Sequence, residues 1–271
     1  MTVATWNVNS IRARLPNVVE WLGARQPDIA CFQELKCEEA KLPRAELEDL
    51  GYNVAVLGQK SYNGVAILAK EPLGEVRPGL PGGDDDEQAR YIEAEIGPLT
   101  VACLYAPNGN PVDSDKFPYK LAWMERLGAR LDELFADDQP ALVLGDFNVI
   151  PEPEDCHDPK AWAGDALFRL ETRRAYRRLL HAGWTDALRA IDQRAGIYTF
   201  WDYQAGAWQH DNGIRIDHAL LSPQAADLLA GCAVDREPRG KPKASDHTPL
   251  VVTLRRPDAA GTAGPVAYSA A

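Results

Sequence analysis

The sequence predicts an α/β protein built from a mixed β-sheet, or two such sheets, with helices on the outside. Two observations support this fold class. Short apolar runs rich in Val, Ile, Leu and Tyr recur along the chain and end in Gly, Pro, Asn or Asp, as buried strands do. Helical patterns fall between some of these runs, whereas other runs follow one another too closely for a helical crossover.

The apolar runs are the predicted strands. Short gaps inside two pairs of them, 52–57 with 65–69 and 91–96 with 99–105, predict antiparallel hairpins. The full set of predicted strands is residues 2–8, 29–33, 52–57, 65–69, 91–96, 99–105, 141–145, 216–221 and 250–254.

Helices are predicted where the pattern changes. Residues 16–24 begin with a proline, which suits the first turn of a helix. Residues 116–135 carry apolar side chains at a period of 3.6, namely Leu121, Met124, Leu127, Leu131 and Leu134. Two shorter helices are predicted at residues 171–182 and 223–230.

Length and composition fit a folded protein without a membrane partner. With 271 residues, of which 45% are hydrophobic, the chain could form one large α/β domain or two small ones. No apolar run of about twenty residues occurs, so we expect no membrane span. The five cysteines form no Cys-x-x-Cys pair, which suggests reduced thiols in a cytoplasmic protein. Residues 257–271 are rich in Ala, Gly, Thr, Pro and Ser and are predicted to be a flexible tail.

The net charge argues against a nucleic-acid partner, because phosphate binding depends largely on Lys and Arg. Lys and Arg number 29 and Asp and Glu 40, which gives −11. A metal site concentrates carboxylates, however, and a local basic strip can hold a phosphate backbone. One such strip is present, either as a solvated helix face or as a phosphate-binding surface: Arg169, Arg173, Arg174, Arg177 and Arg178.

Oxygen-bearing side chains stand at the ends of several predicted strands. Each alone has a structural explanation as a turn residue, a helix cap or a satisfied core histidine. A carboxylate directly after an apolar strand is costly to bury unless it is paired or bound to a metal. Their joint occurrence therefore predicts an active site, with the candidates Asn7, Glu34, Asn108, Asp146, Asn148, Asp217, Asp246 and His247.

Several short motifs appear in a fixed order between residue 5 and about residue 254. They include Thr5-Trp6-Asn7-Val8-Asn9, Gln33-Glu34-Leu35-Lys36, Asn108-Gly109-Asn110-Pro111, Gly145-Asp146-Phe147-Asn148, Phe200-Trp201-Asp202-Tyr203, Arg215-Ile216-Asp217 and Ser245-Asp246-His247. With these motifs the chain resembles the exonuclease III family of abasic-site endonucleases, within the endonuclease/exonuclease/phosphatase superfamily.

The resemblance implies a fold and an activity. The fold would be a DNase I-like four-layer α/β sandwich, with two mixed sheets packed face to face and helices outside. It favours one catalytic domain over residues 1–256. The activity would be that of a Mg²⁺-dependent DNA phosphodiesterase of base excision repair, which incises duplex DNA 5′ to abasic sites and removes 3′ nucleotides or blocking groups. The alternative is a phosphatase or lipid phosphodiesterase of the same superfamily.

The resemblance also implies roles for the candidate residues. The metal ligands would be Glu34 and Asn7, the latter through its carbonyl oxygen, with Asp246 as an outer-sphere partner. Asp146, Asn148 and His247 would lie near the ion. Hard oxygen ligands favour Mg²⁺, with Mn²⁺ as a substitute. Asp146 would act as general base and Asn148 would orient the water. His247, held by Asp217, would face the phosphate, and Tyr105 and Asn108 would donate hydrogen bonds to it.

Contacts with DNA are expected from aromatic and basic residues. An extruded abasic sugar needs a small apolar pocket, for which the candidates are Phe200, Trp201, Trp208 and Ile214. Trp201 could instead belong to the core. Arg173 and Arg177 of the basic strip would contact the backbone. The expected partner is duplex DNA with abasic sites or 3′ ends, bound by a cytoplasmic, nucleoid-associated monomer without an obligate protein partner.

Overall fold

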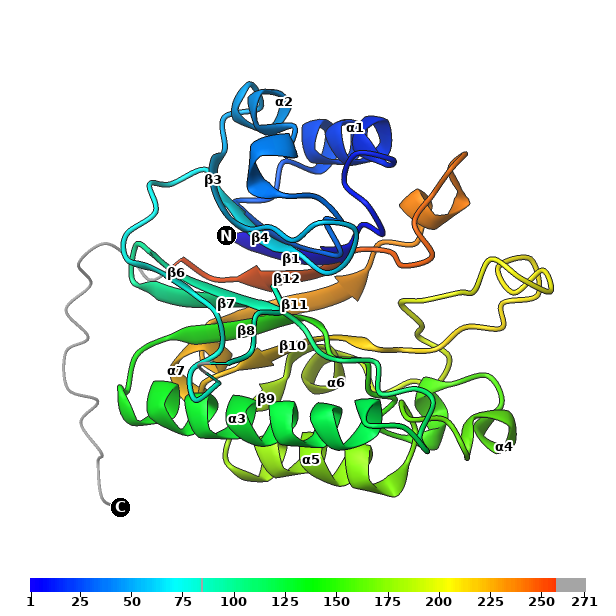
Figure 1. Ribbon diagram of the computed structural model, residues 1–271. Coiled ribbons are helices and arrows are strands. Elements are labelled where there is room, and N and C mark those ends of the chain that lie inside the picture. The colour runs from blue at the N-terminus through cyan, green and yellow to red at the C-terminus, as the bar shows by residue number, and fades with distance from the viewer. Residues whose placement is uncertain (84, 257–271) are drawn as a thin grey trace, which may run out of the picture.

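Two β-sheets lie face to face at the centre of the molecule, and helices cover their outer sides (Figure 1). The computed structural model describes residues 1–83 and 85–256. The predicted four-layer arrangement with two mixed sheets is therefore confirmed. The flexible tail predicted for residues 257–271 lies outside the described residues.

The first sheet brings the beginning and the end of the described chain together. Strand β1 (Thr2–Asn7) pairs in parallel with β2 (Ile29–Gln33) and antiparallel with β12 (Leu250–Leu254). The order is β11-β12-β1-β2-β4-β3, completed by β11 (Leu229–Val234), β4 (Val65–Ala69) and β3 (Asn53–Leu57). The β3–β4 pairing confirms the first predicted hairpin.

The second sheet has the order β5-β6-β7-β8-β10-β9. Strand β7 (Leu99–Tyr105) is parallel to β8 (Ala141–Asp146), and the other pairs are antiparallel. The pairing of β6 (Tyr91–Ile96) with β7 confirms the second predicted hairpin. The remaining strands are β5 (Val76–Pro78), β10 (Asp217–Leu221) and β9 (Thr185–Asp186).

Three apolar layers hold this arrangement together. Val3, Ile67 and Val101 belong to the layer between the two sheets. Helix α1 (Leu15–Arg25) covers the outer face of the first sheet, and α3 (Lys116–Ala136) and α5 (Leu170–His181) cover the second. The shorter helices are α2 (Arg44–Glu48), α4 (Pro159–Trp162), α6 (Ala187–Ile191) and α7 (Pro223–Ala226), with single turns η1 (Glu39–Lys41), η2 (Pro153–Asp155) and η3 (Glu237–Gly240).

The helix predicted at residues 223–230 was partly wrong. Helix α7 ends at Ala226, and the apolar residues that follow form β11, which pairs with β12. The periodicity of such a short run does not distinguish a helix from a strand. The run forms a strand because it can pair with the edge of β12. None of the described helices is long and apolar enough to cross a membrane.

Candidate active site

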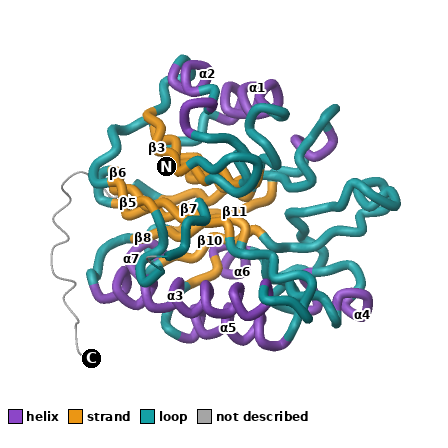
Figure 2. Tube along the Cα trace, in the orientation of Figure 1, coloured by secondary structure: helices purple, strands orange, loops and turns teal. Residues whose placement is uncertain are grey.

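The candidate residues converge on one end of the sandwich, where the longer loops also gather (Figure 2). The parallel strands β1, β2, β7 and β8 all run toward this end, so Asn7, Tyr105 and Asp146 come from strand termini. Strand β10 runs the opposite way and begins there, with Asp217 opposite Asp146. His247 lies three residues before β12, which is also antiparallel to β1.

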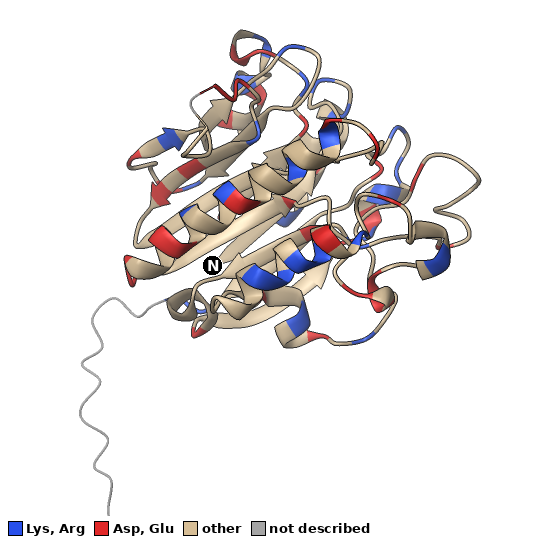
Figure 3. Ribbon diagram, turned by 60° about the horizontal axis from the view of Figure 1, so that its bottom comes forward, with Lys and Arg blue, Asp and Glu red and all other residues tan. Residues whose placement is uncertain are grey.

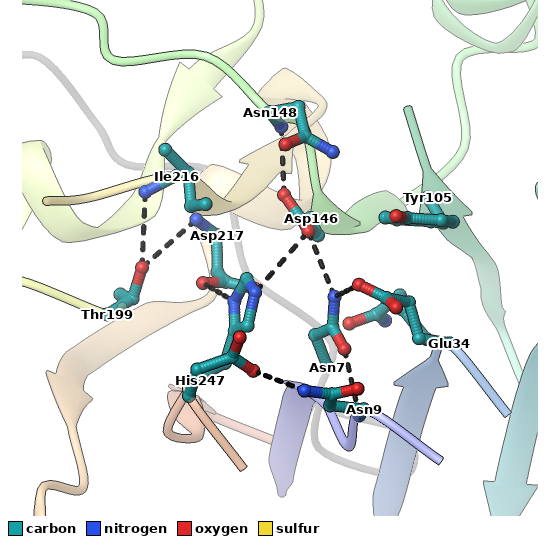
Figure 4. A network of polar contacts seen from close by, with 12 residues as sticks. Asn7, Asn9, Glu34, Tyr105, Asp146, Asn148, Thr199, Ile216, Asp217 and His247 are labelled. Atoms are coloured by element: carbon teal, nitrogen blue, oxygen red, sulfur yellow. Dashed lines mark hydrogen bonds and ion pairs between the residues drawn. The ribbon is translucent and has the colours of Figure 1, made fainter. Parts of the chain in front are cut away.

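Asn7 forms hydrogen bonds with one carboxylate from each sheet, Glu34 from the first and Asp146 from the second. Its Nδ2 atom donates to Oε1 of Glu34 at 2.8 Å and to Oδ2 of Asp146 at 3.0 Å (Figure 4). Its Oδ1 atom accepts from the backbone N–H of Asn9 at 3.0 Å. The structure thus points the amide nitrogen between the carboxylates, where the carbonyl oxygen was expected. Metal binding by that oxygen requires the amide to turn over.

Glu34 is held as a carboxylate by a neighbouring lysine. Its Oε2 atom lies 2.8 Å from Nζ of Lys36. Burial acts to raise the pKa of Glu34, but the charge of Lys36 and the hydrogen bonds from Lys36 and Asn7 outweigh it, so the pKa is lowered. Both Glu34 and Lys36 have left-handed backbones, with φ of 53° each. Such strain in ordinary residues is concentrated at functional sites.

Asp146 is placed by an unusually close approach of two strands. Gly145 has φ of 154°, and a Cβ atom there would lie 1.9 Å from the backbone oxygen of Leu104. A side chain at this position would therefore push β8 away from β7. One residue later, Oδ1 of Asp146 accepts from the backbone N–H of Asn148 at 2.9 Å, which fixes the carboxylate in the loop after β8.

Asn148 is held on every side by the protein. Its Nδ2 atom donates to the Ala106 oxygen at 2.9 Å, and its Oδ1 atom accepts from Nδ2 of Asn108 at 3.2 Å. The fully buried ammonium of Lys120 donates to the backbone oxygens of Asn148 and Asn108, at 2.5 and 3.1 Å. Burial lowers the pKa of Lys120 to about 7. Lys120 therefore ties together the two loops that carry the asparagines.

His247 lies between two carboxylates. Its Nδ1 atom is 2.8 Å from Oδ2 of Asp217, and its Nε2 atom is 3.7 Å from Oδ2 of Asp146. Burial acts to lower the pKa of His247, but the charges of Asp217 and Asp146 outweigh it and raise the pKa to about 10. The imidazole is therefore protonated at neutral pH.

The backbone around Asp217 is fixed by one hydroxyl group. Oγ1 of Thr199 accepts from the backbone N–H groups of both Ile216 and Asp217, at 3.1 Å each. This contact holds the start of β10 against the segment before Phe200. The Phe200 ring, in turn, packs edge-on to the His247 imidazole, with ring centres 4.9 Å apart. Phe200 thus lies beside His247, and its lining of a sugar pocket stays a prediction.

Burial also sets the protonation of Asp146 and Tyr105. It raises the pKa of Asp146 to about 7, with the His247 charge opposing the shift and the charges of Asp217 and Glu34 adding to it. A carboxyl with such a pKa can exchange a proton near neutrality. Burial, assisted by the charges of Glu34 and Asp146, also raises the pKa of Tyr105 well above its ordinary value, so its phenol stays protonated.

The donor set fits a hard divalent cation. Ligand atoms of Glu34, Asp146 and His247 all lie within 4.8 Å of one another. Two of the three groups are carboxylates, and the amide of Asn7 lies between them. Oxygen-rich sites of this kind suit Mg²⁺ or Mn²⁺. Asp246 is outside this group of three, and its Oδ1 atom accepts from Nδ2 of Asn9 at 3.0 Å.

The residues predicted to contact DNA are not all at the surface. Trp201 is 0% and Ile214 1% exposed, so in this structure neither offers a surface to a ligand. Arg173 and Arg177 on α5 both form ion pairs with Glu152, with closest N–O distances of 3.2 and 2.6 Å. Figure 3 shows the basic residues, in blue, that recur along α5, the shorter of the two long helices in front. Trp208 is partly buried against Trp201. Of the apolar candidates, Phe200 and Trp208 retain accessible faces, and the two arginines are also partly exposed.

Four residues that contact the site had no role assigned from sequence. Asn9 and Lys36 lie in motifs that carried the resemblance and Thr199 directly precedes one, and this position was the available signal. Lys120 lies within the helix predicted at residues 116–135. The roles of Lys120 and Thr199 depend on contacts with distant segments, so the sequence did not reveal them. The four are Asn9, Lys36, Lys120 and Thr199.

The fold and these side chains define a hydrolytic enzyme with a candidate metal site. The chain belongs to the endonuclease/exonuclease/phosphatase family, whose sequence profile matches residues 4–247. It is 32% identical over 262 residues to exodeoxyribonuclease III of Haemophilus influenzae, an alignment that covers 92% of this chain and 98% of the relative.

Solved structures agree with this assignment. An AP endonuclease from Archaeoglobus fulgidus is 42% identical with a TM-score of 0.90, over 94% of this chain and 99% of that one. The 3′ phosphatase NExo from Neisseria, bound to a product DNA hairpin, is 38% identical with a TM-score of 0.92, over the same shares of the two chains.

Proposed function

We propose that this protein is a DNA repair nuclease that incises duplex DNA 5′ to abasic sites and removes 3′ nucleotides or blocking groups. The reaction is hydrolysis of a phosphodiester or phosphomonoester by water. The observation that carries the proposal is the buried series Asp217–His247–Asp146, in which the last two side chains approach to 3.7 Å. The named relatives act as exodeoxyribonuclease, AP endonuclease and 3′ phosphatase.

The metal in this proposal is Mg²⁺, with Mn²⁺ as a substitute. Glu34 would hold the ion through oxygen, with Asp146, Asn148 and His247 near it and Asp246 as an outer-sphere partner. When bound, the ion would neutralise charge on the phosphate. Lys36 keeps Glu34 ionised, so a ligand carboxylate is available throughout the neutral range.

Asp146 is the proposed general base. Its pKa of about 7 allows it to take a proton from an attacking water near neutral pH. Asn148 holds one oxygen of Asp146 through its backbone N–H, which leaves the other oxygen directed toward the site. Protonated His247 places a positive charge where the transition state is most negative, and Asp217 keeps it there.

Neutral Tyr105 completes the proposed arrangement. Its raised pKa keeps the hydroxyl proton available for a hydrogen bond to a phosphate oxygen. The guanidinium of Arg90 lies 4.8 Å from the centre of the Tyr105 ring and donates to the Tyr105 backbone oxygen at 3.2 Å, which steadies the residue. Asn108 would provide a second donor when it releases Asn148.

The proposed abasic pocket is at Phe200. Its ring contacts His247 and packs against the apolar cluster that includes Ile150 and Ile214. An extruded sugar that reached the phosphate site would therefore meet an apolar wall on this side. A base still attached to the sugar would need more room, which is the proposed origin of the preference for abasic sites.

The proposal extends to organisation and setting. Residues 1–256 would act as one catalytic unit, since β1 pairs with β2 and with β12 and the site takes residues from both sheets. The protein would be a monomer without an obligate protein partner. All five cysteines are free and buried, which fits a reducing setting such as the cytoplasm. The proposed DNA substrate would place the protein at the nucleoid.

A labelled duplex with one abasic analogue tests the proposal. We would measure incision with Mg²⁺ and with EDTA, beside an intact duplex and a duplex carrying a 3′ phosphate. We expect Mg²⁺-dependent cleavage 5′ to the analogue and release of 3′ nucleotides or phosphate.

The same assay can also contradict the proposal. If the folded protein with Mg²⁺ leaves all three DNA substrates intact, the nuclease function is wrong. The phosphatase branch of the family would then be examined with inositol phosphates and phospholipids. The Asp146→Asn variant serves as the inactive control.

A further inference from the structure

A basic pocket lies beside the proposed catalytic centre. It measures about 400 Å³ and opens to solvent between the segment leading into α1 and the segment after η3, drawn in blue and orange at the loop end of Figure 1. Its charged lining is entirely positive in a chain with net charge −11. The lining residues are Ala13, Arg14, Tyr203, Arg239, Lys241, Lys243 and Ala244.

Three of the four cations have no carboxylate partner among the residues that the structure describes. Only Lys241 is paired, with Glu20 at 2.9 Å and Glu237 at 3.3 Å. Arg14, Arg239 and Lys243 form no ion pair within residues 1–83 and 85–256. Most other arginines of the protein are paired, so three unpaired cations around one pocket indicate that an anion is the missing partner.

Arg239 makes this argument strongest. The residue is 8% exposed, and its Nε atom is buried with no hydrogen-bond partner in the described part of the chain. Its Nη2 atom donates to the Trp201 oxygen at 2.9 Å, and the guanidinium lies 5.4 Å from the centre of the Tyr203 ring. Burial lowers the pKa of Arg239. The charges of Asp246 and Asp202 oppose this shift, but neither carboxylate forms an ion pair with Arg239 within the described residues. A buried guanidinium without an ion-pair partner is costly unless a ligand supplies the opposite charge.

Arg14 faces the same pocket from the other wall. Its Nη2 atom donates to the Tyr203 hydroxyl at 2.9 Å, and its Nε atom is likewise buried without a partner in the described residues. The Tyr203 hydroxyl donates to the Ala244 oxygen at 2.9 Å, which ties the two walls together. The pocket is thus built from fixed side chains, and guanidinium groups match phosphate geometry well.

A single residue connects this pocket with the catalytic site. Nδ2 of Asn9 lies 3.3 Å from the Tyr203 hydroxyl and 3.0 Å from Oδ1 of Asp246, while its backbone N–H donates to Asn7. Phosphates of one B-DNA strand follow one another at ~3.4 Å along the helix axis. If the bound strand runs from Asp146 along Asn9, one of its neighbouring phosphates comes to the pocket at Tyr203.

We propose that Arg14, Arg239 and Lys243 form a second phosphate site, which binds a backbone phosphate of the cleaved DNA strand adjacent to the scissile one. This inference rests on the proposed nuclease function. The site would anchor the strand without touching a base, so it would contribute to affinity and register and not to sequence preference.

Lys243→Glu is the test variant, because Lys243 is exposed and its replacement leaves the buried contacts intact. The matched control is Lys70→Glu, the same change at an exposed lysine just after β4, at the opposite end of the sandwich. We would measure Kd for an abasic duplex in EDTA, its salt dependence, and KM and kcat with Mg²⁺. A thermal melt of each variant checks folding.

We expect Lys243→Glu to weaken binding about tenfold and to raise KM more than it lowers kcat. The slope of log K against log salt should decrease by about one for each phosphate that the variant no longer binds. Lys70→Glu should bind like the wild type. Single methylphosphonate replacements near the abasic site identify the phosphate, because a neutral linkage at the right position should weaken the wild type but not Lys243→Glu.

Two results would overturn the second phosphate site. One is that Lys243→Glu binds the abasic duplex with the same affinity as the wild type. This result counts against the site even if the variant no longer binds inorganic phosphate. The other is an equal response of wild type and variant to every methylphosphonate. Failure of the nuclease proposal would look different, since the wild type would then leave the duplex uncut with Mg²⁺ whatever the binding data show.

Discussion

The Nδ1 atom of His247 lies 2.8 Å from Oδ2 of Asp217, and both side chains are almost completely buried. The other oxygen of Asp217, Oδ1, is buried without a hydrogen-bond partner among the described residues. Among the described residues, the imidazole of His247 is therefore the hydrogen-bond partner of this carboxylate. Its charge is the leading cause that keeps His247 protonated against the effect of burial.

Replacing Asp217 with Asn should uncouple this pair. The amide carries no charge, so the pKa of His247 should fall from about 10 and the imidazole should be neutral at physiological pH. We expect kcat to drop by about 10²- to 10³-fold at neutral pH. Activity against pH and NMR titration of the imidazole test this. An unchanged imidazole pKa with wild-type activity would contradict it.

Replacing Asp146 with Asn should remove the proposed base. We expect kcat to fall by several orders of magnitude, while the Kd for an abasic duplex in EDTA changes only a few-fold. Asp132→Asn, on the exposed side of α3, is the matched control and should retain activity. Equal activity of the Asp146 and Asp132 variants would exclude Asp146 as the base.

The pH dependence of the wild type should follow the same two groups. Asp146 acts when ionised, so kcat/KM should rise with pH toward about 7, with the acid limb lower still when a cation is bound. His247 acts when protonated, so activity should fall again toward pH 10. Steady-state rates from pH 5 to about 11 with Mg²⁺ test this profile. A rate that still increases beyond pH 10 would contradict the role of His247.

Replacing Glu34 with Gln should weaken the metal site. The amide keeps the shape but removes the charge that Lys36 stabilises, so a much higher Mg²⁺ concentration should be needed for half-maximal activity. Calorimetric titration with Mn²⁺ gives a readout that does not depend on activity. The control is Glu46→Gln on α2, an exposed residue outside the site. Identical Mn²⁺ affinities for the two variants would remove Glu34 from the ligand set.

Stability should depend on pH through His218. Burial and the adjacent Arg215 lower its pKa to about 4; Arg215 faces Nδ1 at 3.0 Å, and Nε2 lies 2.9 Å from the Val149 oxygen. The unfolded state binds a proton near pH 6.5, whereas the folded state does not until about pH 4. The stability that neutral His218 contributes should therefore be fully present above pH 6.5. The free energy of unfolding should decrease as the pH falls below this value, by roughly 3 kcal/mol in total.

Urea denaturation at about pH 7.5, 6 and 4.5 measures this decrease. His218→Gln should flatten the dependence, whatever its effect on absolute stability. His181→Gln, at the exposed end of α5, should leave the slope as in the wild type. A wild-type slope in the His218 variant would show that other groups carry the pH dependence.

Local pattern was sufficient for most of the fold. The hairpins followed from spacing alone, because a gap of two residues between β6 and β7 excludes a crossover. Strand β11 was missed because its identity depends on pairing with β12, which is distant from the local sequence. Strand β9 is only two residues long and exists through its contact with β10.

The centre of the site was more predictable than its surroundings. Carboxylates at the ends of apolar strands are conspicuous, so Asp146, at the end of β8, and Asp217, at the start of β10, could be found in the sequence. The partner of a surface arginine is not conspicuous, and Glu152, which binds Arg173 and Arg177, lies more than twenty residues away from either. The unpaired cations at Arg14 and Arg239 could not be recognised until the fold showed that no carboxylate reaches them among the described residues.

The pairing of β1 with β12 has a consequence for synthesis of the protein. β1 is translated first and β12 last among the strands, and at ~5–20 residues per second roughly 10 to 50 s separate them. Asn7 and His247 belong to these two ends of the strand order, so a nascent chain that has not yet reached β12 cannot assemble the site. The molecule should therefore gain the ability to cut DNA only after β12 has been translated, and shorter nascent chains should be inactive.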